Sequence, residues 1–149
     1  MGTSGVERLL AVARERIERV EPAEAWAAAS TGSALIVDLR SSDERRRHGI
    51  VPGSLHVPRS VLEWRADPAG RWRNPHLDAR ERLILLCAEG YSSSLAAASL
   101  LDLGHARGAD LVGGFRGWLA AGLPIVAAPE EDGSLPGMDA PAPWSGIID

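Results

Sequence analysis

The chain has 149 residues, about the length of one globular domain. Its composition, 45% hydrophobic and 24% charged, is ordinary for a protein that buries most of its apolar surface around one core, which excludes disorder throughout. With 16 basic and 20 acidic residues, the net charge is -4, so the chain has no general positive field that would attract nucleic acid or a membrane. All the basic residues are arginine, and the absence of lysine excludes enzymes that use a Schiff-base or P-loop lysine.

Helix and strand patterns alternate along most of the chain. Ser4 followed by Glu7 forms a capping-box start for a helix, and Pro22 suits the first turn of another. Two runs, 34–38 and 83–87, are apolar on both faces, as central parallel strands are. In chain order, the patterns predict a helix over residues 4–16, a strand over 17–20, a helix over 22–30, a strand over 34–38, a charged segment over 43–47, a turn over 51–54, a strand over 55–57, a helical turn over 60–65, a strand over 83–87, a helix over 93–103, a strand over 110–112 and a helix over 115–121.

This alternation indicates an α/β fold with a mainly parallel sheet, in which functional sites lie at the carboxyl ends of the strands. Residues 127–149 are rich in proline, glycine and acidic side chains, which favours a tail without packed elements. Trp144 and the Ile147–Ile148 pair are apolar, so the alternative that this segment docks on the domain as a latch stays open. We therefore expect an N-terminal helix (1–16), a domain (17–126) and a C-terminal tail (127–149).

Cys87 stands at the end of a predicted buried strand, before a loop that leads into a helix. Loop amides and the positive end of the helix dipole favour a thiolate over a thiol at such a place. Gly90 permits the backbone angle that the curl of the loop requires. The alternative interpretation is a structural cysteine buried at a strand end.

Cys87 is also the only cysteine of the chain. A single cysteine excludes an internal disulfide, a Cys-x-x-Cys pair and a cysteine-based zinc cluster. We expect neither a metal nor a cofactor. No run of 18 apolar residues occurs, and the first residues lack the pattern of a signal peptide. These observations favour a reducing, cytoplasmic location without membrane partners.

Four motifs in order resemble the rhodanese (sulfurtransferase) family over about residues 20–126. They are Leu35–Arg40, His48–Ser54, Cys87-x-x-Gly-x-x-Ser, and Gly113-Gly114-Phe115-x-x-Trp118. The resemblance implies a five-stranded parallel sheet with helices on both faces, a rhodanese-like domain over 17–126, and a cysteine that carries a persulfide sulfur from a donor to an acceptor. A non-catalytic member, acting as a binding or sulfur-sensing module, is the alternative.

The cysteine loop departs from the pattern of that family. Active members commonly carry arginine directly after the cysteine and at the sixth loop position, where this chain has Ala88 and Ser92, and Glu89 adds a negative charge. The departure argues against thiosulfate as a good donor, but it leaves persulfide chemistry on Cys87 intact because that chemistry relies on backbone amides. Cysteine phosphatases of the same fold carry arginine where this chain has Ser93, so a phosphatase is disfavoured.

Several further residues are candidates for the site or its surroundings. Arg59, Trp64 and Arg65 follow a strand whose outgoing loop, by the resemblance, lies near the cysteine, and they are candidates for the missing cation and for an aromatic wall. The alternative is a surface arginine with its stem packed on a core tryptophan. The remaining expectations are a structural pair of Asp38 with Arg40, a solvated helix face for 45–47, a turn for His48, and core positions for Trp118 and Leu119.

The sequence thus predicts a single-domain sulfurtransferase with Cys87 as the catalytic residue. The substrate-binding residues that we predict are Ala88, Glu89, Gly90, Tyr91, Ser92, Ser93, Arg59 and Arg65. Because no second cysteine exists to resolve a persulfide, the partners are a small-molecule sulfur donor and an external acceptor, either a small thiol or a protein.

Overall fold

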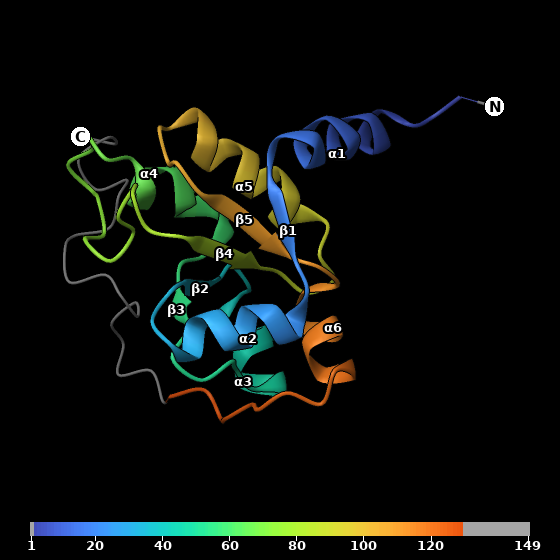
Figure 1. The fold of residues 1–149 in the computed structure, drawn as a ribbon, viewed down its shortest axis with the longest axis vertical. Coiled ribbons are helices and arrows are strands. Elements are labelled where there is room, and N and C mark those ends of the chain that lie inside the picture. The colour runs from blue at the N-terminus through green and yellow to red at the C-terminus, as the bar shows by residue number, and fades with distance from the viewer. Residues whose placement is uncertain (1, 130–149) are drawn as a thin grey trace.

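The computed structural model describes residues 2–129, and its strands form one parallel five-stranded sheet in the order β1-β5-β4-β2-β3 (Figure 1). The expected α/β class, with helices on both faces, is confirmed. The elements are α1 (Gly5–Arg16), β1 (Glu18–Val20), α2 (Pro22–Ser30), β2 (Leu35–Asp38), α3 (Ser42–His48), β3 (Leu55–His56), a 3-10 turn (Arg59–Val61), α4 (Leu62–Ala66), β4 (Leu83–Leu86), α5 (Ser92–Asp102), β5 (Gly108–Leu111) and α6 (Gly114–Ala120).

Most elements begin and end within two residues of the predicted positions. The capping box that starts α1 is present, with the Glu7 N–H donating to the Ser4 hydroxyl over 3.2 Å and the Ser4 N–H donating to the Glu7 carboxylate over 2.9 Å. Two differences concern the site. β4 ends at Leu86, so that Cys87 is the first residue of the loop, and His48 is the last residue of a helix rather than part of a turn.

Side chains of β4 alternate between two apolar layers and bind the sheet to helices on both sides. Leu83 and Leu85 pack with residues of α4 and α5, whereas Ile84 and Leu86 pack with residues of α2 and α6. All four side chains are fully buried. The strand is therefore the centre of the core, and the residue that follows it is held at the carboxyl edge of the sheet.

The carboxylate of Asp38, at the end of β2, forms the buried ion pair that the sequence led us to expect with Arg40. Arg40 donates to it through Nε (3.0 Å) and Nη2 (2.9 Å), and Arg45 through Nε (3.2 Å). The expectation of a solvated face for 45–47 is wrong for Arg45, which is only 5% exposed because it turns inward to Asp38. The cluster fastens the start of α3 to the end of β2, beside the cysteine loop.

The described part of the chain ends near the predicted boundary of the tail. Ile50 and Val126 exchange two backbone hydrogen bonds of 2.8 and 3.0 Å. The predicted tail beyond residue 129, with Trp144 and the Ile147–Ile148 pair of the alternative latch, lies outside the described residues. The division of the chain at residues 16 and 126 stays a prediction.

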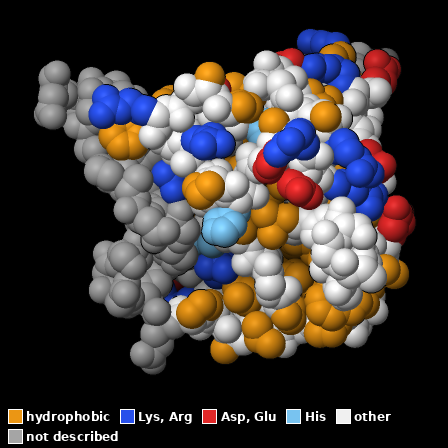
Figure 2. Space-filling view, turned by 60° about the vertical axis from the view of Figure 1, so that its left-hand side comes forward, with side chains coloured by type: hydrophobic (Ala, Val, Ile, Leu, Met, Phe, Trp, Pro, Cys, Tyr) orange, Lys and Arg blue, Asp and Glu red, His pale blue; other side chains and the backbone are white. Residues whose placement is uncertain are grey.

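Charged side chains of both signs share the surface. On the face drawn in Figure 2, arginine and acidic side chains are interspersed among apolar and uncharged ones. Within residues 2–129, none of the helices combines the length and the apolar character that crossing a bilayer requires.

Replacing Asp38 by asparagine is expected to lower the free energy of unfolding by about 3 kcal/mol, because two buried guanidinium groups lose their counter-charge. The matched control is Asp43→Asn, which removes the carboxylate of exposed pairs with Arg46 and Arg47 and is expected to cost less than about 0.5 kcal/mol. Urea unfolding followed by circular dichroism measures both. Equal losses in the two variants would contradict the assignment of Asp38 as a buried anchor.

Candidate functional site

The thiol of Cys87 lies at the carboxyl end of the central strand and is almost entirely buried, with 7% of the residue exposed. The N–H of Gly90 donates to its Sγ over 3.1 Å. This contact requires the loop to curl back on itself, and Gly90 has the positive φ of 86° that such a curl needs. The predicted arrangement, a sulfur held by a loop amide before a helix, is present.

The first turn of α5 supplies further donors to the sulfur. Burial raises the pKa of the Cys87 thiol, but the hydroxyls of Ser93 and Ser92 and the N–H groups of Ser93 and Gly90 together bring that pKa below its ordinary value. Hydrogen bonds to the charged form therefore outweigh the desolvation of the thiolate. This direction agrees with the depression of the thiol pKa expected from the sequence.

A buried carboxylate, Asp110, organises the hydroxyls beneath the loop. It accepts hydrogen bonds from Ser93 Oγ (2.9 Å), Ser94 Oγ (2.7 Å) and Arg19 Nε (3.0 Å). A serine hydroxyl has one proton, so Ser93 serves either Asp110 or the sulfur at one time. Because Ser94 and Arg19 remain on Asp110, Ser93 is free to turn to a thiolate without leaving the carboxylate unpaired.

The glycine pair before α6 packs directly on the cysteine loop. A Cβ built on Gly114 would lie 2.5 Å from the carbonyl oxygen of Cys87 and 2.7 Å from the nitrogen of Gly90, so no larger residue fits without moving the loop. The N–H groups of Phe115 and Arg116 donate to the carbonyls of Cys87 (2.8 Å) and Ala88 (3.1 Å). Two motifs far apart in sequence thus form one backbone unit.

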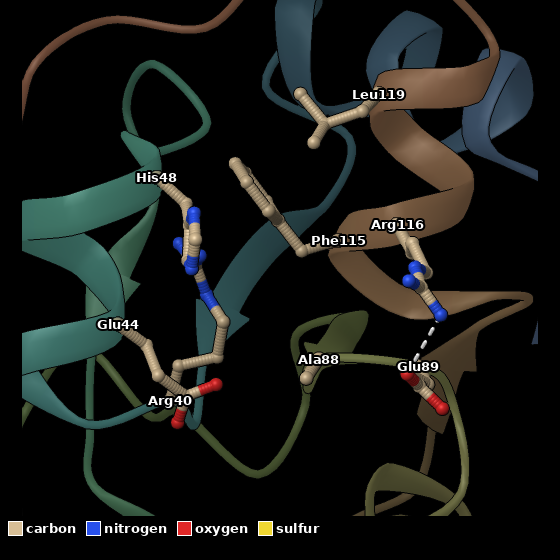
Figure 3. A pocket seen from close by; sticks show the side chains of 8 residues that line it. All are labelled: Arg40, Glu44, His48, Ala88, Glu89, Phe115, Arg116 and Leu119. Atoms are coloured by element: carbon tan, nitrogen blue, oxygen red, sulfur yellow. Dashed lines mark hydrogen bonds and ion pairs between the residues drawn. The ribbon is translucent and has the colours of Figure 1, made fainter.

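A pocket of about 360 Å³ opens beside this unit (Figure 3). The guanidinium of Arg40 lies 3.8 Å from the centroid of the Phe115 ring, and Arg116 pairs with Glu89 over 3.0 Å. Leu119, expected in the core, is 44% exposed because it faces this pocket. The lining residues come from the end of β2, α3, the cysteine loop and α6: Arg40, Glu44, His48, Ala88, Glu89, Phe115, Arg116 and Leu119.

The structure brings together the loop residues of the predicted site but not the two predicted arginines. Arg59 pairs with Glu63 over 2.8 Å on its own helical turn. Arg65 is 3% exposed and donates to the carbonyl of Trp72, so it packs inside the protein and is not the surface arginine of the alternative interpretation either. Neither is among the residues that line the pocket beside the loop.

Around the sulfur, the loop divides into exposed and buried positions. The side chains of Ala88, Glu89, Tyr91 and Ser92 are exposed, whereas Gly90 and Ser93 are buried. In the described part of the chain, no group of three or more histidine, cysteine or acidic side chains is arranged to hold a metal ion.

Sequence reasoning did not identify the cationic residues of the pocket or of the buried network. The sequence placed Arg40 near the site by the resemblance but favoured a structural pair with Asp38, although one of its nitrogens, Nη1, is buried without a partner among the described residues. Arg116 and Arg19 were not expected at the site at all. The available signal was position, since Arg40 and Arg116 follow the ends of β2 and β5, at the edge of the sheet where Cys87 lies.

Comparison with known proteins shows which family this chain is similar to. The family model described as "Rhodanese-like domain" matches residues 21–121. The "Thiosulfate sulfurtransferase GlpE" of Actinobacillus succinogenes is 29% identical over 109 residues, which cover 73% of this chain and 90% of that protein. A "Sulfurtransferase" of Allochromatium vinosum is 31% identical over 99 residues, covering 66% of this chain and 84% of that protein.

A solved structure is also similar. A protein of unknown function from Rhodopseudomonas palustris, described as a possible tyrosine phosphatase, superposes with a TM-score of 0.77 at 34% identity. The match covers 85% of this chain and 97% of the other. It extends the likeness beyond the residues of the family model.

The alkylation of Cys87 by iodoacetamide tests the geometry of the loop. The pH midpoint of the rate is expected below that of the same thiol in the urea-unfolded chain, because folding lowers the thiol pKa. By linkage, the folded state gains stability relative to Cys87→Ser as the pH rises from the folded-state pKa toward the unfolded one. A midpoint equal to that of the unfolded chain would show that the loop does not stabilise the thiolate.

A pair of glycine variants serves as the internal control of this measurement. Gly114 and Gly122 both have positive φ, so alanine at either position introduces backbone strain of about 1 kcal/mol. A Cβ at Gly122 has no atom within 4 Å, whereas one at Gly114 collides with the loop. Only Gly114→Ala is therefore expected to raise the midpoint, and an equal shift in both variants would refute a direct effect on the loop.

Proposed function

The chain belongs to the rhodanese-like domain family, and we propose that it is a sulfurtransferase in which Cys87 takes up a sulfane sulfur as a persulfide and passes it to an external acceptor. The observation that carries the proposal is the buried Sγ of Cys87, held by the N–H of Gly90 in a loop whose next two residues, Ala88 and Glu89, line a pocket. A structural cysteine would have no need of donors that favour its anion.

The reaction has two displacement steps. In the first, the Cys87 thiolate attacks the outer sulfur of a donor persulfide, the S–S bond of the donor breaks, and the donor leaves as a thiolate; from thiosulfate the leaving group is sulfite. In the second, an acceptor thiolate attacks the terminal sulfur of the Cys87 persulfide, which restores the Cys87 thiolate and leaves a persulfide on the acceptor. In each step the electron pair of the broken S–S bond leaves with the departing sulfur, so no external oxidant is needed.

The loop supports both steps because its donors are neutral and fixed. The N–H groups of Gly90 and Ser93, at the N-terminus of α5, stabilise negative charge on Sγ, and we propose that the same end of the helix stabilises the charge on the terminal sulfur after loading. Ser93 can donate to the sulfur while Ser94 and Arg19 hold Asp110. We propose that Ala88, Glu89, Gly90, Tyr91, Ser92 and Ser93 line the substrate, as the sequence predicted, and that Arg59 and Arg65 do not.

The pocket beside the loop is the proposed entrance for donor and acceptor. Its charges are mixed, with Arg40 and Arg116 opposed by Glu44 and Glu89, so it is suited to small thiols that carry both charges better than to a dianion. The single cysteine requires the acceptor to be another molecule. A protein acceptor and a cytoplasmic location stay predictions from the sequence.

A phosphatase activity is the competing possibility that the description of the Rhodopseudomonas palustris protein raises. A cysteine phosphatase needs a guanidinium to grip the phosphoryl oxygens through paired hydrogen bonds. The corresponding position here is Ser93, whose hydroxyl lies 2.9 Å from the Asp110 carboxylate. The site therefore favours sulfur transfer over phosphoryl transfer.

Replacing Cys87 by serine is expected to abolish sulfur loading and transfer, because serine has no nucleophilic sulfur to form the persulfide. Intact-mass measurement after incubation with cysteine persulfide, glutathione persulfide or thiosulfate detects an added sulfur atom on the wild type, and a thiol reductant removes it. The melting curve should stay close to that of the wild type. Transfer that survives in Cys87→Ser would disprove the proposed mechanism, and binding without any loading of the wild type would favour the non-catalytic module.

Glu89→Gln is expected to improve thiosulfate use about fivefold at low salt, since it removes a carboxylate beside the pocket and frees Arg116 from its 3.0 Å pair. The gain should shrink at high salt and be small for the singly charged cysteine persulfide. Glu81→Gln, an exposed acid that is not among the residues lining this pocket, is the matched control. The same gain with both donors, or in the control, would argue against the charge explanation.

A further inference from the structure

The segment before the family match reaches the cysteine loop. Arg14 of α1 and Arg19 of β1 both precede residue 21, where the match to the family model begins. Both guanidinium groups donate through Nη2 to the carbonyl oxygen of Gly90, Arg14 over 2.9 Å and Arg19 over 3.1 Å. One backbone oxygen of the loop is thus held by two cations from outside it.

Arg14 makes the wider set of contacts with the loop and with α5. Its Nε donates to Ser94 Oγ over 3.0 Å, and its guanidinium carbon lies 5.8 Å from the centroid of the exposed Tyr91 ring. The helix that carries it, α1, lies beside α5 (Figure 1). Arg16 of α1 pairs with Asp102 of α5 over 2.6 Å. A docked helix therefore holds Arg14 behind the loop.

These contacts fix the orientation of the peptide plane between Gly90 and Tyr91. The peptide bonds of the described chain are trans, so a carbonyl that points to the arginines turns the N–H of the same peptide unit to the opposite side. The preceding peptide unit carries the Gly90 N–H that donates to Cys87 Sγ. The arginine contacts to the Gly90 carbonyl therefore restrain the neighbouring peptide unit, whose N–H donates to Cys87 Sγ.

The two arginines differ in their charge balance. Arg19 stands opposite Asp110 in the sheet register and pairs with it, so its charge is neutralised by a fully buried carboxylate. No carboxylate of residues 2–129 lies within ion-pair distance of Arg14. The loop itself, residues 87–92, contains no basic residue and one acidic one, Glu89.

We propose that Arg14 is a positioning residue of the sulfur-transfer site, which from helix α1 orients the Gly90–Tyr91 peptide and supplies the positive charge that the cysteine loop lacks. The inference deepens the proposed function of Cys87 and rests on it for its catalytic meaning. It also makes α1 part of the working site rather than an appendage.

Arg14 is the better residue to replace, because the two variants differ in what they leave behind. Removing Arg19 leaves the buried Asp110 with its charge uncompensated, which would destabilise the fold in general. Removing Arg14 leaves behind the Ser94 hydroxyl, which still donates to Asp110, and the Gly90 carbonyl, which still accepts from Arg19. The charged groups that otherwise face the loop, and stay in place, are Glu89 with Arg116, Arg19 with Asp110, and Arg40.

The test compares Arg14→Gln with the wild type by the pH dependence of Cys87 alkylation. The midpoint is expected to rise by about 0.5 to 1 unit, as for one unit charge removed from a partly exposed position several ångströms away. Arg14→Lys keeps the charge but loses the two-pronged contact, so it should recover more than half of the shift. Melting temperatures are expected to stay within a few degrees of the wild type.

Two variants on the same helix are the matched controls. Arg16→Gln removes the pair between α1 and Asp102 of α5, and Arg8→Gln removes an exposed charge that donates to the Thr3 carbonyl. Neither should move the midpoint appreciably. A midpoint that is unchanged in Arg14→Gln, or that moves as much in Arg16→Gln, would overturn the proposal.

The rate of sulfur transfer is measured on the same variants. A parallel loss in Arg14→Gln, with recovery in Arg14→Lys, supports the positioning role. If the wild type takes up no sulfur from any donor, the proposed function fails, whereas the comparison of alkylation midpoints still decides whether Arg14 acts on the loop.

Discussion

The backbone of the cysteine loop lies against the backbone of the Gly113–Gly114 turn, and the rest of the site depends on this contact. Because neither glycine has a side chain, the N–H groups at the start of α6 reach the carbonyls of Cys87 and Ala88. These hydrogen bonds hold the two carbonyl groups toward α6, and the N–H of Gly90 donates to Cys87 Sγ. The same contact places α6 so that Phe115 forms a wall of the pocket.

Two buried carboxylates flank the central strand near the point where it ends. Asp38 is paired in register with Leu86 on one side of β4, and Asp110 with Leu85 on the other. Asp38 binds Arg40 and Arg45, and Asp110 binds Arg19; of these, Arg19 also donates to the Gly90 carbonyl and Arg40 lines the pocket beside the loop. In a chain without lysine, the electrostatics of the site are built from planar guanidinium groups, which are well suited to such fixed, multiply bonded positions.

This design suits a sulfur that must be both anionic and reactive. A cation in direct contact with Sγ would lower the thiol pKa further, but nucleophilicity falls as the pKa falls. Amide and hydroxyl donors at the sulfur lower the pKa of Cys87, whereas the cations of Arg14 and Arg19 are held behind the loop carbonyl and leave Sγ without a direct ion pair. The arrangement also serves a persulfide, whose charge lies one atom farther out.

The sequence alone determined the sheet and the place of Cys87, because strands apolar on both faces and helix caps are local patterns that survive folding. It did not determine the partners of the arginines. Arg65 turns inward, Arg45 lies on Asp38, and Arg14 meets the carbonyl of Gly90 across 76 residues of sequence. Long charged side chains find partners wherever packing brings two segments together, so only the tertiary structure decided which cations serve the cysteine loop.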